Sequence, residues 1–347
     1  MLGLTMKNAM GELALIERIR SGWGGRGGRG LTLGIGDDCA ILHPPAGHEV
    51  LVTTDFSLEG RHFHRDWHPP ESAGHRALAR GLSDLTAMGA RPLAAFLSLA
   101  LPGDTMETRA GRQWVQRFFA GLHALAAEHA VPLAGGDTSE SPCGLVLADI
   151  VLVGTAPAGC ALRRSGGRAG DALYVSGALG GSAAELVELE RRGTRKRRGM
   201  GERQAGTAGM HPQLYPQPRI ALGQALLRRH LATAAIDLSD GLSTDLGHLC
   251  RESGVGAEVL ESALPIHPLA AAIPERALAL ALNGGEDYEL LFAARPSVKV
   301  PRSIAGVAIT RIGKLMPGTG MTLMDAAGRR CPMKPAGWEH FAAGSRR

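Results

Sequence analysis

The stretch Ala234-Ala235-Ile236-Asp237-Leu238-Ser239-Asp240-Gly241-Leu242 decides the fold class, because a strand pattern meets a helix pattern across an acidic turn. Residues 234–238 predict a strand, and the apolar spacing of residues 244–250 predicts a helix. In proteins that mix helices with sheets, the loops at strand ends are where ligands bind. The acidic turn is therefore a candidate binding site.

The same alternation of strands and helices recurs along the chain. Further strands are predicted at residues 51–54, ending at Asp55, and at 92–101, 131–134, 145–153, 173–175 and 289–292. Helices are predicted near residues 13–19, from 70 to 88, and at 105–129, 183–189 and 220–227. Since 347 residues exceed one ordinary domain, we predict an α/β (α+β) protein of two domains, residues 1–157 and 158–347.

Cysteine usage and hydropathy indicate the compartment. The five cysteines are scattered and form no Cys-x-x-Cys pair, which is typical of a reduced cytosol. The first residues carry Glu12 and Glu17 and lack the apolar core of a signal peptide. The longest apolar stretch, near residues 93–101, is about half the ~20 residues that a membrane helix needs. We predict a cytoplasmic protein without a membrane-spanning segment.

The net charge of +5 is concentrated in one segment. Seven basic residues against one acidic residue lie in 191–203, so the remainder of the chain is close to neutral. Residues 193–212 are poor in apolar side chains and are predicted to be a disordered, basic insertion. A nucleic-acid-binding role for this run is disfavoured, because it contains no aromatic residue on which a base could stack.

Aspartates beside glycine, serine or threonine form the most informative pattern. These acidic turns are Gly36-Asp37-Asp38, Thr53-Thr54-Asp55, Ser83-Asp84, Gly135-Gly136-Asp137-Thr138, Asp237-Leu238-Ser239-Asp240-Gly241 and Gly284-Gly285-Glu286-Asp287. Each alone is more simply a turn former. If they converge, their repulsion requires a cation, at roughly 4 kcal/mol per close pair near a protein surface. Oxygen ligands of this kind favour Mg²⁺, which commonly accompanies nucleotide phosphates.

Other phosphate-handling and hydrolytic motifs are absent. The sequence contains no Gly-x-x-x-x-Gly-Lys-Ser/Thr loop, no Gly-x-Ser-x-Gly elbow and no protein-kinase catalytic loop. Carboxylate-bound metal is the remaining way to handle phosphate.

The acidic turns, in this order, resemble those of the thiamine-monophosphate kinase family, within the superfamily that includes aminoimidazole ribonucleotide synthetase. The resemblance also covers residues 11–13, 60–63, 82–90, 164–166, 284–292 and 337–341, and so nearly the whole chain. It implies an N-terminal, mixed-sheet domain that pairs in a homodimer, a C-terminal α+β domain, and a metal-rich cleft between them.

The resemblance also implies roles for individual residues. The Mg²⁺ shell would comprise Asp38, Thr53, Thr54, Asp55, Asp84, Asp137, Asp237 and Asp240. Of these, Asp55, Asp137 and Asp240 would be catalytic. Contacts to ATP would come from Gly136, Arg164 and Ser239, and contacts to thiamine monophosphate from His62, Glu286 and Trp338. Trp338 would stack on the flat thiamine rings, and Glu286 would balance their charge.

The expected reaction is the transfer of phosphate from ATP to thiamine monophosphate. The acceptor oxygen is already anionic, so direct in-line attack needs charge neutralisation and positioning rather than a strong base. Phe56 and Glu140 depart from the family pattern, in which a hydroxyl residue and an arginine are common.

Several alternatives stay open. Another ATP-using synthetase of the same superfamily remains an alternative function. Arg164 could be a solvated charge, Trp338 ordinary packing, and His64 and His68 surface residues.

Overall fold

The computed structural model describes residues 12–23, 30–197 and 211–338, with the side chains of 194–197 left out. The chain divides into two compact units. The first comprises Met1–Leu82 and Pro92–Thr155, and the second comprises Ser83–Arg91 and Ala156–Arg347. Ser83–Arg91, which includes the end of a long helix, therefore belongs to the second unit although it lies within the N-terminal half of the sequence.

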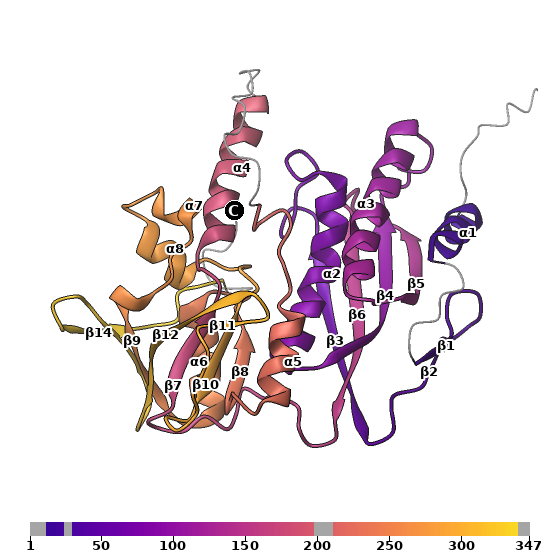
Figure 1. Cartoon of the computed structure of the whole chain (residues 1–347). Coiled ribbons are helices and arrows are strands. Elements are labelled where there is room, and N and C mark those ends of the chain that lie inside the picture. The colour runs from indigo at the N-terminus through magenta and orange to yellow at the C-terminus, as the bar shows by residue number, and fades with distance from the viewer. Residues whose placement is uncertain (1–11, 24–29, 198–210, 339–347) are drawn as a thin grey trace, which may run out of the picture. The chain divides into compact units, whose positions relative to one another are not determined.

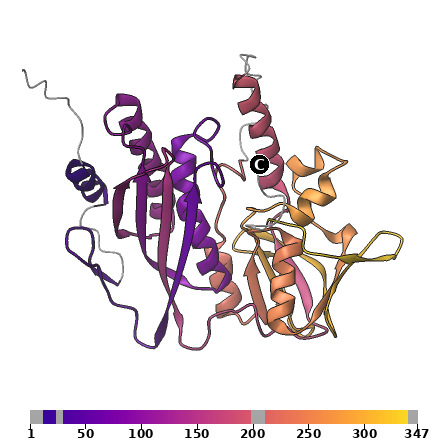
Figure 2. The same cartoon turned by 180° about the vertical axis from the view of Figure 1, so that it is seen from behind.

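The first unit is built on a four-stranded sheet of order β3-β6-β4-β5. Its strands are β3 (His48–Leu58), β4 (Arg91–Leu101), β5 (Leu133–Glu140) and β6 (Leu147–Pro157). Helices α2 (Pro70–Ala87) and α3 (Arg109–Glu128) lie along one face of the sheet, and no described helix lies on the other (Figures 1 and 2). The remaining elements are α1 (Glu12–Trp23) and the small β1 (Leu31–Leu33) and β2 (Ile41–Leu42) pair.

Apolar spacing explains why α2 and α3 pack on this sheet. Leu78 and Leu82 of α2, and Phe118 and Leu122 of α3, are all completely buried, as is Leu152 of β6. Residues three or four apart share one face of a helix, so each helix presents one apolar stripe to the sheet. The second face of the sheet remains available for other contacts.

The second unit contains an eight-stranded sheet in which β14-β13-β9-β12-β7-β10-β8 follow one another and β11 pairs with β12. Its strands are β7 (Ala172–Ser176), β8 (Ala234–Asp237), β9 (Gly256–Leu260), β10 (Leu290–Ala294), β11 (Ser303–Ile304), β12 (Val307–Met316), β13 (Met321–Met324) and β14 (Arg330–Met333). The sheet is mixed, because β13 runs parallel to β9 whereas β10 runs antiparallel to both β7 and β8.

Helices complete the second unit. They are α4 (Gly181–Arg197), α5 (Ile220–Arg228), α6 (Leu242–Ser253), the short η1 (Glu261–Ala263), α7 (Pro268–Ala271) and α8 (Ala277–Asn283). Helix α6 packs on β8 and β9 and contributes Leu246 and Leu249 to the main core. A smaller core joins α4, α7 and α8 through Ala184, Ala270 and Leu280.

The predicted α/β (α+β) fold class is confirmed, and several predicted boundaries are wrong. The strand predicted to end at Asp55 continues to Leu58, and the strand predicted at 131–134 extends through Asp137 to Glu140. The predicted helix at 105–129 begins at Arg109, where the Thr108 hydroxyl accepts the N–H of Gly111. Among the described helices, none combines the length and apolarity needed to cross a bilayer.

The predicted disordered insertion at 193–212 is wrong at its first residues. Helix α4 continues to Arg197, so residues 193–197 are helical. Residues 198–210 lie outside the described part of the chain. His211 is again described, and its Nδ1 lies 2.6 Å from Glu185 Oε1 of α4.

Candidate active site

Asp237 ends strand β8 and is almost completely buried. Its Oδ2 accepts a hydrogen bond of 2.7 Å from the hydroxyl of Ser83 on α2, which is also buried. This bond brings the acidic pair Ser83-Asp84 to the end of β8, within the second unit. Two of the predicted acidic turns therefore meet in the structure.

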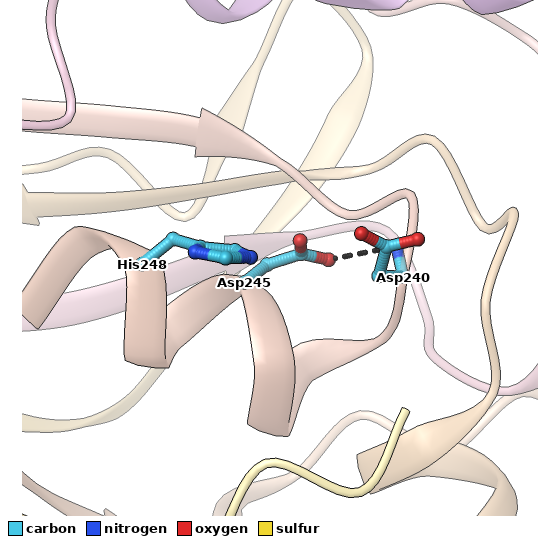
Figure 3. Close-up of side chains that lie close together, drawn as sticks. All are labelled: Asp240, Asp245 and His248. Carbon is cyan, nitrogen blue, oxygen red and sulfur yellow. Dashed lines mark hydrogen bonds between the residues drawn. The ribbon is translucent and has the colours of Figure 1, made fainter. Parts of the chain in front are cut away.

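The turn after β8 leads into a cluster of Asp240, Asp245 and His248 (Figure 3). One ligand atom from each residue lies within 4.8 Å of the others. Asp245, in the first turn of α6, accepts the backbone N–H groups of Asp240 and Gly241 at 3.1 and 3.0 Å. The carboxylate thereby fixes the acidic turn that precedes α6.

Burial, with neighbouring charges, shifts the pKa values of two residues in this cluster. Loss of water around the carboxyl, together with the charges of Asp237 and Asp240, raises the pKa of Asp245 to about 8. Burial, followed by the nearby Arg251 and Arg164, lowers the pKa of His248. Sequence reasoning missed both Asp245 and His248. The only signal was the spacing of three residues between Asp245 and His248, which places both on one face of a helix.

The loop before β10 places Glu286 beside the same turn. The Glu286 N–H donates to the Ser239 carbonyl at 2.8 Å, and the Tyr288 N–H donates to the Leu238 carbonyl at 2.9 Å. Glu286 has a φ of 65°, in the left-handed region that side chains other than glycine rarely adopt. Such strained backbone persists where its surroundings hold it, and it is common at functional sites.

The C-terminal described segment reaches the acidic turn as well. The Trp338 N–H donates to the Asp240 carbonyl at 3.0 Å. A Cβ atom on Gly337 would lie 2.0 Å from that carbonyl oxygen, so only glycine permits this approach. Trp338 is 43% exposed. The predicted residues Asp237, Ser239, Asp240, Glu286 and Trp338 are thus joined by local contacts.

In the first unit, successive side chains of β3 point to opposite faces of the sheet, so the predicted Mg²⁺ ligands on this strand lie on two different faces. Asp55 and Thr53 are partly buried on one face, whereas Thr54 is exposed on the other. The Thr54 hydroxyl donates to Asp149 Oδ1 at 2.8 Å. Both Nε and Nη2 of Arg80 donate to Asp55 Oδ1, at 3.1 and 2.9 Å. Arg80 was not predicted as a site residue, although it lies in the helix that the sequence predicted from residue 70 to 88.

Strand β5 holds the Gly136-Asp137 pair against β4. Gly136 pairs with Leu97 in a parallel register, and a Cβ atom on Gly136 would lie 1.9 Å from the Leu97 carbonyl oxygen. A cavity of about 120 Å³ borders this pair. Its lining includes Asp137 and Thr138 beside the apolar side chains of Ile16, Ile19, Ile35, Leu99 and Phe119. A flat apolar group with a charged end fits such a lining.

Three predicted residues have more isolated positions. Asp38 is exposed, and its N–H donates to Asp37 Oδ1 at 2.9 Å. His62 Nδ1 accepts the N–H of Leu58 at 3.0 Å. Arg164 is exposed, and its carbonyl accepts the Ser253 hydroxyl at 2.8 Å.

The expectation that His68 is a surface residue is wrong. His68 is 3% exposed, and its Nδ1 accepts the N–H of His64 at 3.1 Å. This histidine is therefore part of a buried turn.

Comparison with known proteins gives these residues a family context. The family models for AIR synthase related proteins match twice, the N-terminal domain at residues 36–156 and the C-terminal domain at residues 168–324. The chain is 38% identical to a thiamine-monophosphate kinase of Escherichia coli O157:H7, over 96% of this chain and 99% of that protein. The chain belongs to the thiamine-monophosphate kinase family.

Solved structures of this family have the same fold. The chain matches a thiamine-monophosphate kinase from Stenotrophomonas maltophilia K279a with a TM-score of 0.74 and 35% identity, covering 93% of this chain and 98% of that one. It matches a structure described as AaThiL complexed with AMPPCP and TMP with a TM-score of 0.71 and 28% identity. That match covers 98% of this chain and 100% of the other.

The donor set of the second unit fits a hard divalent cation. Asp240 and Asp245 offer carboxylate oxygens within one small volume, and Asp237 adds to their negative field. Such oxygens are the ligands that Mg²⁺ prefers, whereas the nitrogen of His248 suits softer metals. Burial raises the pKa of Asp245 most, and the charges of Asp237 and Asp240, which a bound cation would offset, add to it.

Proposed function

We propose that this chain transfers the γ-phosphate of ATP to thiamine monophosphate, forming thiamine diphosphate. The 38% identity to a thiamine-monophosphate kinase over 96% of the chain carries this proposal. The related structure described with AMPPCP and TMP supports both substrates. The contacts that join Ser239, Asp240, Glu286 and Trp338 supply a local site of suitable chemistry.

Thiamine monophosphate has flat rings, one of them cationic. The exposed indole of Trp338 can stack on these rings, and the carboxylate of Glu286 can balance the charge. His62 is proposed as a third contact to this substrate. Because Trp338 and Glu286 are each anchored through their backbone N–H groups to the turn at 239–240, a substrate held by both would be fixed beside that turn.

ATP is proposed to contact Gly136, Arg164 and Ser239. The proposed contact of Gly136 to a phosphate comes from its backbone, since the space where a Cβ atom would lie is occupied by the Leu97 carbonyl of β4. The guanidinium of the exposed Arg164 can pair with phosphate oxygens.

Mg²⁺ is proposed to be held by acidic and hydroxyl residues of the predicted acidic turns. They are Asp38, Thr53, Thr54, Asp55 and Asp137 in the first unit, and Asp84, Asp237 and Asp240 in the second. The bound cation would neutralise phosphate charge. The hydroxyl of Thr54 is bonded to Asp149 in this structure.

The residues of the chain then position two anions for direct in-line transfer. The attacking phosphate oxygen is already anionic, so no strong general base is required. Asp55, Asp137 and Asp240 are proposed as the catalytic residues, and Arg80 orients the carboxylate of Asp55.

We further propose a homodimer and a cytoplasmic location. The uncovered face of the first sheet carries Val50, Val52 and Phe56 of β3, which are 50%, 64% and 59% exposed. An apolar strip of this kind is characteristic of an association surface, and the resemblance to the family points to a second copy as its partner. All five cysteines are free, as expected in a reducing compartment.

The decisive test is a direct product assay. The purified chain is incubated with ATP, Mg²⁺ and thiamine monophosphate, and thiamine diphosphate is measured by chromatography alongside ADP. Equal amounts of ADP and thiamine diphosphate are expected, and no product is expected when thiamine replaces its monophosphate. ATP turnover without thiamine diphosphate would favour a different enzyme of the superfamily.

A further inference from the structure

The segment after the basic insertion is fastened to helix α4. Both carboxylate oxygens of Glu185, which is 9% exposed, contact this segment. Oε1 lies 2.6 Å from His211 Nδ1, and Oε2 accepts the backbone N–H of Gln213 at 2.8 Å. Glu185 therefore holds the backbone of Gln213 independently of the contacts that the Gln213 side chain makes.

The side chain of Gln213 connects α4 to Glu286. Gln213 is 1% exposed, its Oε1 accepts the hydroxyl of Ser182, and its Nε2 donates to Glu286 Oε2 at 3.1 Å. An amide has one accepting and one donating end, so the Ser182 hydroxyl on the oxygen directs the nitrogen toward the carboxylate. Ser182 thus orients the side chain of Gln213, and Gln213 in turn contacts Glu286.

The neighbours of Glu286 fix its backbone from the other side. Its N–H is bonded to Ser239, and the following Asp287 accepts the N–H groups of Gly180 and Ser182 at 2.6 and 3.1 Å. Ser182 therefore contacts both Gln213 and Asp287. The Glu286 carboxylate extends from a backbone fixed at two points and receives a hydrogen bond from a buried amide.

We propose that Gln213 is a positioning residue that orients the Glu286 carboxylate toward the cationic ring of the substrate. This inference rests on the proposed function, in which Glu286 contacts thiamine monophosphate. A carboxylate that is already oriented loses less side-chain freedom on binding. This strengthens the binding of a cationic substrate and leaves ATP binding unaffected.

The test compares Gln213→Met in two backgrounds. Methionine has a similar length and no hydrogen bond to offer. In the wild-type background, the KM for thiamine monophosphate should rise about tenfold, while the KM for ATP changes less than about twofold. In a Glu286→Gln background, the same substitution should change the KM for thiamine monophosphate less than about twofold, because the carboxylate that it orients is gone.

The control is Gln224→Met on α5, which should leave both KM values within about twofold of the wild type. Equal effects of Gln213→Met in both backgrounds, or an equal rise in the KM for ATP, would overturn the positioning role while leaving the proposed function intact. A wild-type chain that forms no thiamine diphosphate would overturn both.

If Gln213→Met fails to fold, as judged by circular dichroism, Ser182→Ala replaces it. Removing the hydroxyl that orients the amide should raise the KM for thiamine monophosphate several-fold, again only where Glu286 is present. An unchanged KM in Ser182→Ala would contradict the proposal.

Discussion

The Ser83 hydroxyl donates a hydrogen bond of 2.7 Å to Asp237 Oδ2, between two side chains that lie 154 residues apart in the sequence. Both are nearly inaccessible to solvent. The bond holds one carboxylate oxygen of Asp237 in place. It also fixes the Ser83-Asp84 pair beside the turn that carries Asp240. The arrangement of this acidic group is therefore built into the second unit.

Asp240→Asn should nearly abolish phosphoryl transfer without unfolding the chain. An amide removes one negative charge from the proposed Mg²⁺ site, and kcat should fall by about 100-fold or more. The matched control is Glu252→Gln, which makes the same chemical change at an exposed position of α6, the helix that follows the turn of Asp240. Steady-state kinetics and circular dichroism provide the measurement. Full activity in Asp240→Asn would count against a catalytic role for this cluster.

Trp338→Ala should weaken the binding of thiamine monophosphate. Stacking of an indole on a cationic ring contributes about 1 kcal/mol, so the KM for this substrate should rise about fivefold with little change for ATP. Trp338→Phe keeps an aromatic face and should recover most of the loss. If only the KM for ATP moved, Trp338 would belong at the nucleotide instead.

Sequence periodicity identified the regular elements near the site, because their apolar faces are local properties. The helical spacing of Leu78, Leu82 and Leu85 is visible without the fold, as is the strand that ends at Asp237. Strand β5 was predicted too short, because Gly135-Gly136-Asp137 has the composition of a turn. Pairing with β4 imposes the strand there, and that pairing is not visible in the local sequence.

The site itself was predictable only where a motif identified it. Asp237, Asp240, Glu286 and Trp338 belong to motifs, and the structure joins them through the backbone of residues 238–240. Asp245 was not predicted, since an acidic residue in the first helical turn is an ordinary feature of helices. Gln213 was not predicted either, because its contacts depend on how the chain returns to α4 after the insertion.

The stability of the chain should depend on pH through Asp287. Loss of water around the carboxyl is the largest effect and the charge of Glu289 adds to it, so the pKa is raised from 3.8 to about 7 despite the N–H groups of Gly180 and Ser182. Between these values the native state binds more protons than the unfolded state, so this group makes the protein less stable as pH rises. Asp287→Asn cannot titrate. The free energy of unfolding of Asp287→Asn minus that of the wild type should therefore increase between about pH 4.5 and 7.5.

Urea unfolding at several pH values measures this difference, with Asp325→Asn as the control. The pKa of Asp325 is lowered by the backbone N–H and then the side chain of Arg329, so its stabilising contribution is complete above the unfolded value of 3.8. The difference for Asp325→Asn should stay constant over the same pH range. A constant difference for Asp287→Asn as well would show that its carboxyl is already ionised at the low end.

The basic run should be dispensable for catalysis. Arg191 and Arg192 both pair with Glu188 on the surface of α4, at 2.7 and 2.9 Å, and exposed pairs of this kind contribute little to stability. Replacing the five basic residues from Arg195 to Arg203 by glutamine preserves chain length and helix propensity. Turnover with thiamine monophosphate should change less than about twofold. A large loss, accompanied by loss of salt-sensitive binding to nucleic acid in the same variant, would favour the nucleic-acid interpretation.

Phe56→Glu should dissociate the proposed homodimer. Phe56 is 59% exposed and lies with Val52 on the uncovered face of the first sheet, where a partner copy would bury it. A buried charge without a partner costs several kcal/mol, and the two-fold symmetry of a homodimer places the same charge on both copies. Sedimentation velocity should show a dimer for the wild type and a monomer for the variant at micromolar concentration. Leu13→Glu on α1, which replaces a residue that is 82% exposed, should leave the dimer intact. A wild-type chain that sediments as a monomer would contradict the proposal that the apolar strip on β3 is a dimer interface.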